Sequence, residues 1–236
     1  MRYLLLIRGI HHDLSYRGKG DDYRRTHRDA RQKIIGPLRR EGHSVDVLLS
    51  TYATKHVDDL KRVYGPVDVL LTQKRWQDTA KTECILAALD WVAERRASYD
   101  FVIVYRFDLT LHRPWPEMGF DPDKINFLWR ETGFDTVPRD RLWRDHRRVG
   151  DAILAFPTRL LGPFQRGVEE VAERVVINVA DNCHRLLWHL KDKIDTERDV
   201  HIVFDGYYDS DPARMRNPAY DEIDCRTTAP LGRGAR

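Results

Sequence analysis

The strongest constraint on the fold is a series of short apolar segments that alternate with helix-like segments in the first half of the chain. Four segments are rich in residues that favour β-structure: Tyr3–Ile7, Val45–Leu49, Val67–Leu71 and Phe101–Tyr105. Helical patterns lie between them: residues 22–38, 57–64 and a long segment that begins at Asp78. A strand, a helix and a further strand in this order are typical of right-handed crossovers, so the sequence predicts an α/β fold with a mostly parallel sheet.

The second half of the chain is less regular. We expect strands at Ile125–Trp129, Ala152–Phe156 and Val200–Phe204, and helices at Leu160–Arg174 and Asn182–Leu190. No stretch resembles a linker between domains. The sequence therefore predicts a single domain over residues 1–228, followed by a disordered tail at residues 229–236.

Composition excludes some classes of protein. No apolar run approaches the roughly 18 residues that span a bilayer, and the first residues are typical of a strand and not of a signal peptide. The three cysteines, Cys84, Cys183 and Cys225, are odd in number and far apart. This pattern argues against a disulfide framework or a zinc site and predicts a reducing, cytoplasmic location.

Polar residues follow the predicted strands at the ends where ligands bind in open parallel sheets. The fourth strand is followed by Arg106-Phe107-Asp108, and the first by Arg8-Gly9. An aspartate at such an edge can hold a divalent cation, and an arginine can bind phosphate. The alternative is an arginine–aspartate pair that closes the strand and does nothing else.

Hydroxyl-bearing residues end the second and third strands. Thr51-Tyr52 and Thr72 are suited to contact a nucleotide base and ribose, although hydroxyls at such positions also cap helices. Further along the chain, Asp151 enters a buried strand behind Gly150, where a carboxylate could act as a general base or serve a structural purpose. His184 lies on a helical stretch, where it could be a second metal ligand beside Asp108 or a histidine of the core.

With these residues in place, the chain resembles nucleotide-sugar glycosyltransferases of the GT-A fold. It looks most similar to small enzymes of large DNA viruses and of bacterial surface-polysaccharide clusters. The motifs that carry the resemblance are Arg8-Gly9, VDVLLSTY at 45–52, YDFVIVYRFDL at 99–109, RVGDAILAFP at 148–157 and NPAY at 217–220. In that family a D-x-D motif binds Mn²⁺ or Mg²⁺ together with the donor diphosphate, whereas this chain has Arg106-Phe107-Asp108 and lacks the first acid.

The resemblance implies that residues 1–115 bind a nucleoside-diphosphate sugar and that residues 116–228 face a glycan or another hydroxyl acceptor. The residues expected to bind the donor are Arg8, Gly9, Thr51, Tyr52, Thr72, Arg106 and Asp108. Asp108 and His184 would hold Mn²⁺ or Mg²⁺, and Asp151 would be the catalytic base. The aromatic and acidic loop Asp205–Tyr220 is expected to contact sugar.

Two other functions are compatible with parts of the sequence. A nucleotidyltransferase acting on a sugar phosphate shares the sheet and the need to bind phosphate, but the loop GIHHDLSYRGKG at 9–20 fits its glycine-rich motif poorly. A nucleic-acid-binding protein could use the segment Arg17–Arg40, which has nine basic and three acidic residues. Because Tyr16 and Tyr23 are the only aromatic residues nearby, we expect no nucleic-acid partner.

Overall fold

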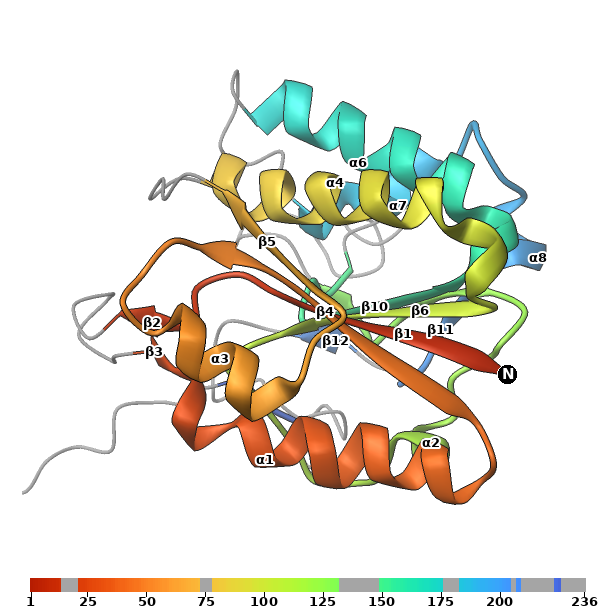
Figure 1. Cartoon of the computed structure of the whole chain (residues 1–236). Helices are drawn as coiled ribbons and strands as arrows, with labels where there is room; N and C mark the ends of the chain where they lie inside the picture. The colour runs from red at the N-terminus through yellow and green to blue at the C-terminus, as the bar shows by residue number, and fades with distance from the viewer. Residues whose placement is uncertain are drawn as a thin grey trace, which may run out of the picture.

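The computed structural model describes residues 1–13, 21–72, 78–131, 149–175, 183–204, 207–208 and 223–225. Its centre is a seven-stranded sheet with the strand order β11-β8-β10-β6-β1-β4-β5 (Figure 1). The strands are β1 (Arg2–Arg8), β4 (Ser44–Tyr52), β5 (Asp68–Thr72), β6 (Phe101–Arg106), β8 (Ile125–Phe127), β10 (Ile153–Pro157) and β11 (Val200–Ile202). Three two-stranded sheets pair β2 (His12–Asp13) with β3 (Asp21–Asp22), β7 (Leu109–Leu111) with β13 (Ile223–Cys225), and β9 (Arg130–Glu131) with β12 (Tyr207–Tyr208).

The central sheet is mixed but mostly parallel. Strands β5, β4, β1 and β6 are parallel neighbours, β10 is antiparallel to both β6 and β8, and β11 is parallel to β8. The α/β fold with a mostly parallel sheet is therefore confirmed. The arrangement is compatible with a Rossmann-like fold, and it places the ends of β1, β4, β5 and β6 on one edge.

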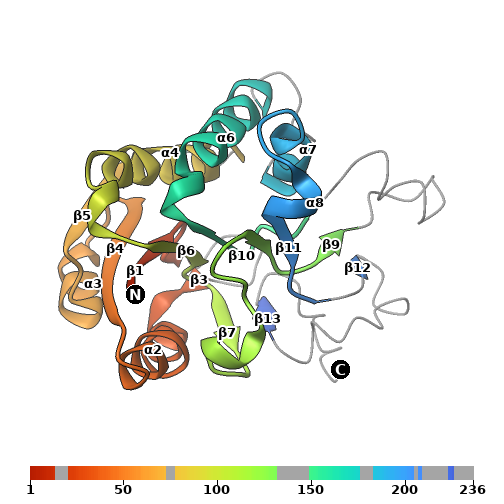
Figure 2. The ribbon, with the colours of Figure 1, turned by 90° about the vertical axis from the view of Figure 1, so that its right-hand side faces the viewer.

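Helices cover both faces of the sheet (Figures 1 and 2). Their bounds are α1 (His27–Asp29), α2 (Gly36–Arg40), α3 (Val57–Tyr64), α4 (Asp78–Glu94), α6 (Leu161–Val175), α7 (Leu186–Leu190) and α8 (Thr196–Asp199). In Figure 1, α4, α6 and α7 lie above the sheet and α1, α2 and α3 lie below it. In the part of the chain that the structure describes, no helix is both long and apolar enough to cross a membrane.

The sheet has a hydrophobic core on each face, because successive side chains of a strand point to opposite faces of the sheet. Leu5 of β1 packs in the core that contains Ile34. Leu4 packs in the core that contains Leu89 of α4 and Phe164 of α6. All five side chains are fully buried.

The predicted helix at residues 22–38 differs from the observed one. The segment contains α1, a π-helical stretch at Ala30–Ile35 and α2, which continues to Arg40. A glycine and a proline inside a helical pattern predict a break at Gly36-Pro37, and this prediction is wrong because the helical segment runs through both residues. The Gly36 N–H bonds to the Arg31 carbonyl five residues earlier, and a Cβ at Gly36 would lie 2.9 Å from that oxygen. Glycine thus allows the wide turn that carries the chain past a proline that cannot donate.

Other boundaries shift by a few residues. The predicted helix Asn182–Leu190 is described from Cys183, as a 3₁₀ turn followed by α7. Most of the predicted sugar-binding loop, the tail at residues 229–236 and the NPAY motif lie outside the described residues. The division into a donor half and an acceptor half remains a prediction.

Candidate functional site

Three segments that are distant in sequence meet at the carboxyl edge of the sheet. Arg8 is the last residue of β1 and Arg106 the last residue of β6, and the two are paired neighbours across the parallel ladder. Asp151 precedes β10, whose first residue Ile153 pairs with Tyr105. Because β10 runs in the opposite direction, its beginning lies at the same edge as the ends of β1 and β6.

Arg106 joins two carboxylates at this edge. It donates to Asp108 through Nε to Oδ1 at 2.8 Å and through Nη2 to Oδ2 at 2.5 Å. Its Nη1 donates to Oδ1 of Asp151 at 3.1 Å. The guanidinium therefore presents its planar fork to one carboxylate and a further N–H to the other, a geometry that lysine cannot reproduce.

Arg8 approaches Asp151 from the neighbouring strand. Its Nη2 donates to the Asp151 backbone carbonyl at 2.7 Å and lies 3.8 Å from Oδ2 of the same residue. The side chains of Arg8 and Asp151 are 2% and 4% exposed. Buried ions are tolerated when their charges are balanced, and here two arginines face two aspartates.

One buried donor of this cluster has no acceptor among the described residues. Nε of Arg8 is fully shielded from solvent and makes no hydrogen bond there. A buried N–H without a partner is costly, so water or an anionic ligand would stabilise this position. The guanidinium thus has hydrogen-bonding capacity that Asp151 does not use.

His184 lies on the other side of Asp151. Its Nε2 is 3.8 Å from Oδ1 of Asp151, and its Nδ1 is 3.2 Å from the Val149 carbonyl. The Val149 N–H in turn donates to the His184 carbonyl at 2.8 Å. The structure therefore places His184 next to Asp151, whereas the sequence predicted it as a partner of Asp108 in a metal site.

Asp108, one of the two predicted metal ligands, is held by Arg106 in this arrangement. Both oxygens of Asp108 accept hydrogen bonds from Arg106. Across the residues that the structure describes, no three histidine, cysteine, aspartate or glutamate side chains are grouped to hold an ion. The binding of Mn²⁺ or Mg²⁺ by Asp108 and His184 stays a prediction, and no chemical step below depends on it.

The remaining predicted donor-binding residues connect the ends of β1, β4 and β5. Gly9 has a φ of +103°, a left-handed conformation that favours glycine, and its N–H donates to the Ser50 carbonyl at 3.1 Å. Thr51 donates through Oγ1 to the Gly9 carbonyl at 2.7 Å, and Thr72 donates to the Thr51 carbonyl at 3.2 Å. These side chains fix the shape of the edge.

Tyr52 is 3% exposed and packs with Cys84. Burial, together with the neighbouring Cys84, raises the pKa of the Tyr52 phenol, which stays protonated at neutral pH. In the described structure the ring of Tyr52 belongs to the core, whereas the sequence suggested a surface for a nucleotide base.

Sequence reasoning assigned no structural role to His11. Its ring is buried, with Nδ1 2.6 Å from Oγ1 of Thr51 and Nε2 2.7 Å from Oγ1 of Thr54. The signal in the sequence is the pair His11-His12, which follows the first strand after Gly9 and Ile10. Adjacent side chains of an extended segment point to opposite sides, so one histidine of such a pair can face inward.

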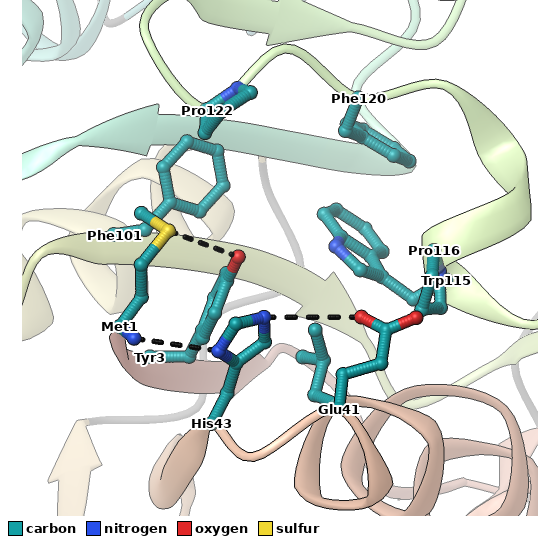
Figure 3. A pocket seen from close by; sticks show the side chains of 10 residues that line it. Met1, Tyr3, Glu41, His43, Phe101, Trp115, Pro116, Phe120 and Pro122 are labelled. Atoms are coloured by element: carbon teal, nitrogen blue, oxygen red, sulfur yellow. Dashed lines mark hydrogen bonds and ion pairs between the residues drawn. The ribbon is translucent and has the colours of Figure 1, made fainter.

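A separate cavity of about 370 Å³ lies at the opposite edge of the sheet (Figure 3). Its wall includes Tyr3, the second residue of β1, and Phe101, the first residue of β6, together with Trp115, Phe120, His43 and Glu41. Nε2 of His43 lies 3.8 Å from Oε2 of Glu41. None of the predicted site residues lines this cavity, so the charged cluster and the cavity are distinct places.

Comparison with known proteins identifies no family for this chain. No protein-family model matches the sequence, and no curated protein is significantly similar to it.

Proposed function

We propose that the chain is a glycosyltransferase that moves a sugar from a nucleoside-diphosphate sugar to a hydroxyl group of a glycan or another acceptor. The observation that carries the proposal is the meeting of Arg8, Arg106, Asp108, Asp151 and His184 at the carboxyl edge of a mostly parallel sheet. This is the edge where open α/β sheets bind ligands. The resemblance of the sequence to GT-A enzymes supports the same reaction.

The residues of the cluster are suited to the charges of such a reaction. When the bond between the anomeric carbon and the donor phosphate breaks, negative charge grows on the departing nucleoside diphosphate. Arg8 and Arg106 would stabilise this charge through hydrogen bonds from their guanidinium groups, of which the first is buried and the second partly buried. Asp151 would accept the proton of the attacking hydroxyl.

A nucleotidyltransferase would use the same arginines to stabilise a different leaving group. It would attack phosphorus and release pyrophosphate, whereas the proposed reaction releases a nucleoside diphosphate. A cytoplasmic location is part of the proposal, and the free, buried thiol of Cys84 is compatible with a reducing compartment.

The proposal is tested by screening UDP-, GDP- and dTDP-sugars for thermal stabilisation, with Mn²⁺ and in excess EDTA, and then by identifying the product released from the best donor. We expect one nucleotide family to raise the melting temperature and a nucleoside diphosphate to be released. Release of pyrophosphate from a sugar phosphate and a nucleoside triphosphate would instead support the nucleotidyltransferase.

A pair of arginine variants tests the location of the site. Arg106→Lys keeps the charge but loses the bidentate contact, so donor affinity should fall roughly tenfold or more. Arg198→Lys is the matched control, because Arg198 also holds an aspartate through Nε and Nη2, but at α8, where it contacts Asp199. Equal donor affinity in the two variants would contradict the assignment.

A further inference from the structure

Asp151 is suited to act as a base, but both oxygens of its carboxylate lie close to basic side chains. Oδ1 lies 3.1 Å from Nη1 of Arg106 and 3.8 Å from Nε2 of His184. Oδ2 lies 3.8 Å from Nη2 of Arg8. Both oxygens therefore face nitrogen atoms of basic side chains, and a carboxylate held in this way is poorly placed to accept a proton from a hydroxyl group.

The same two guanidinium groups lie at the carboxyl edge of the sheet, where the proposed function expects the donor diphosphate to bind. A diphosphate brings more negative charge than one carboxylate and has more oxygens to accept hydrogen bonds. Nε of Arg8 already lacks an acceptor among the described residues, so the resident carboxylate leaves this donor of Arg8 unsatisfied. A phosphate oxygen would satisfy that donor where Asp151 does not.

We propose that Asp151 is a resident counter-ion of Arg8 and Arg106 in the free protein, and that the diphosphate of the donor displaces its carboxylate. The inference rests on the proposed function and adds an order of events to it. Donor binding occupies the arginines and releases the carboxylate of Asp151, which becomes available to the acceptor hydroxyl. Before the donor binds, the base is held by its own counter-ions and the acceptor is not activated.

The reaction that follows is balanced in atoms and electrons. The acceptor oxygen forms a bond to the anomeric carbon, and the bond from that carbon to the phosphate oxygen breaks. The electron pair of the broken bond leaves with the nucleoside diphosphate, whose charge the two arginines neutralise. The proton of the acceptor hydroxyl passes to the released carboxylate of Asp151.

Removing a residue that binds a ligand normally weakens the binding. If Asp151 competes with the ligand for the arginines, removing its charge should instead strengthen the binding of an anion. Because the carboxylate of Asp151 competes with the anion for the same guanidinium groups, Asp151→Asn should bind inorganic pyrophosphate about tenfold more tightly than the wild type. Asp151→Ser, a smaller neutral variant, should show the same gain. Transfer of sugar should be lost in both, because the proton acceptor is missing.

Asp199→Asn is the matched control. Asp199 is also buried and is held by two hydrogen bonds from an arginine, Arg198, but at α8. Its loss should leave pyrophosphate affinity unchanged. Circular dichroism and thermal unfolding of each variant establish that the protein compared is folded.

The experiment is isothermal titration calorimetry of pyrophosphate and of nucleoside diphosphate in EDTA, with the wild type and the three variants. Tighter pyrophosphate binding in both Asp151 variants, and not in Asp199→Asn, is the expected result. Equal or weaker binding in the Asp151 variants, with a wild type that binds nucleotide, overturns the displacement and leaves the proposed function standing. Tighter pyrophosphate binding without any nucleotide binding supports the displacement and contradicts the glycosyltransferase. Absence of binding to every variant contradicts both.

Discussion

At the scale of single residues, Gly150 controls where Asp151 lies. The Gly150 N–H donates to the Trp129 carbonyl at 3.0 Å, and a Cβ at this position would lie 2.6 Å from Cε2 and Nε1 of the Trp129 ring. Because that ring is buried, Gly150→Ala should displace the chain next to Asp151 and destabilise the protein by about 1–3 kcal/mol. Urea unfolding and donor affinity measure the two effects.

Gly162→Ala is the control for this prediction. A Cβ at Gly162 would meet Nη1 of Arg166 at 3.6 Å, an ordinary contact with the end of a flexible side chain. Alanine also favours a helix over glycine, so stability should be unchanged or slightly higher. If both variants were as stable as the wild type and bound the donor equally well, the fit of Gly150 against Trp129 would not determine the site.

Asp108 provides a second prediction at this scale. Asp108→Asn replaces a carboxylate that receives two hydrogen bonds from Arg106 with an amide that has one acceptor oxygen. Turnover should fall about a hundredfold or more, because the arginine that stabilises the leaving group loses its orientation. Unchanged turnover of Asp108→Asn would show that Asp108 has no role in the reaction. Full activity of the wild type in excess EDTA would contradict the predicted role of Mn²⁺ or Mg²⁺ and leave the arginine role intact.

At the scale of elements, α6 is attached to the sheet through an aromatic pair. Phe164 of α6 stacks on Phe156 of β10 with ring centroids 4.1 Å apart, and both side chains are fully buried. Phe164→Ala should therefore cost about 3–5 kcal/mol in the free energy of unfolding. Phe164→Leu keeps most of the volume and should cost less than about 1.5 kcal/mol. Similar losses in the two variants, measured in urea, would contradict a packing role for the ring.

The elements also show what a sequence pattern can predict. Strands β1 and β6 were found because each has five consecutive apolar residues bounded by charged residues, and β4 was found from its VDVLL pattern. The antiparallel direction of β10 was not predicted, since an apolar run carries no information about direction. The π-helical stretch before Pro37 was missed because it depends on one glycine next to the Arg31 carbonyl.

At the scale of the whole molecule, stability should depend on pH through the contact between α6 and the chain that follows α7. Lys193 lies 2.5 Å from Oε1 of Glu170, and His189 lies 3.1 Å from Oε2. Hydrogen bonding from Lys193, with a further one from His189, lowers the pKa of Glu170 below its usual 4.5 although burial opposes the shift. The stabilisation is then complete above the usual pKa and is lost as the pH falls through the lowered pKa.

Glu170→Gln tests this pH dependence. The Glu170 side chain is 43% exposed, so solvent screening keeps the expected loss below about 1 kcal/mol at about pH 7. The difference from the wild type should shrink at about pH 3, where both proteins lack the charge. Glu169→Gln, at an exposed neighbouring position, is the control. A loss of equal size at both pH values would mean that the charge of Glu170 is not responsible.

The candidate site was predicted in part, and the reasons differ between residues. Arg8, Arg106 and Asp108 follow from strand ends, since parallel strands end at one edge. The contacts of Asp151 with both arginines could not be read from the sequence, because they depend on the direction of β10. Burial of Tyr52 against Cys84 was missed because it depends on how α4 packs on the sheet.

The central claim is that a nucleoside-diphosphate sugar binds at the carboxyl edge of the sheet. A crystal structure with the nucleoside diphosphate that stabilises the protein most tests it directly. We predict that its phosphates contact Arg8 and Arg106, with the carboxylate of Asp151 moved away from both. A nucleotide bound in the cavity between Tyr3 and Trp115, with the arginine cluster unchanged, would contradict the claim.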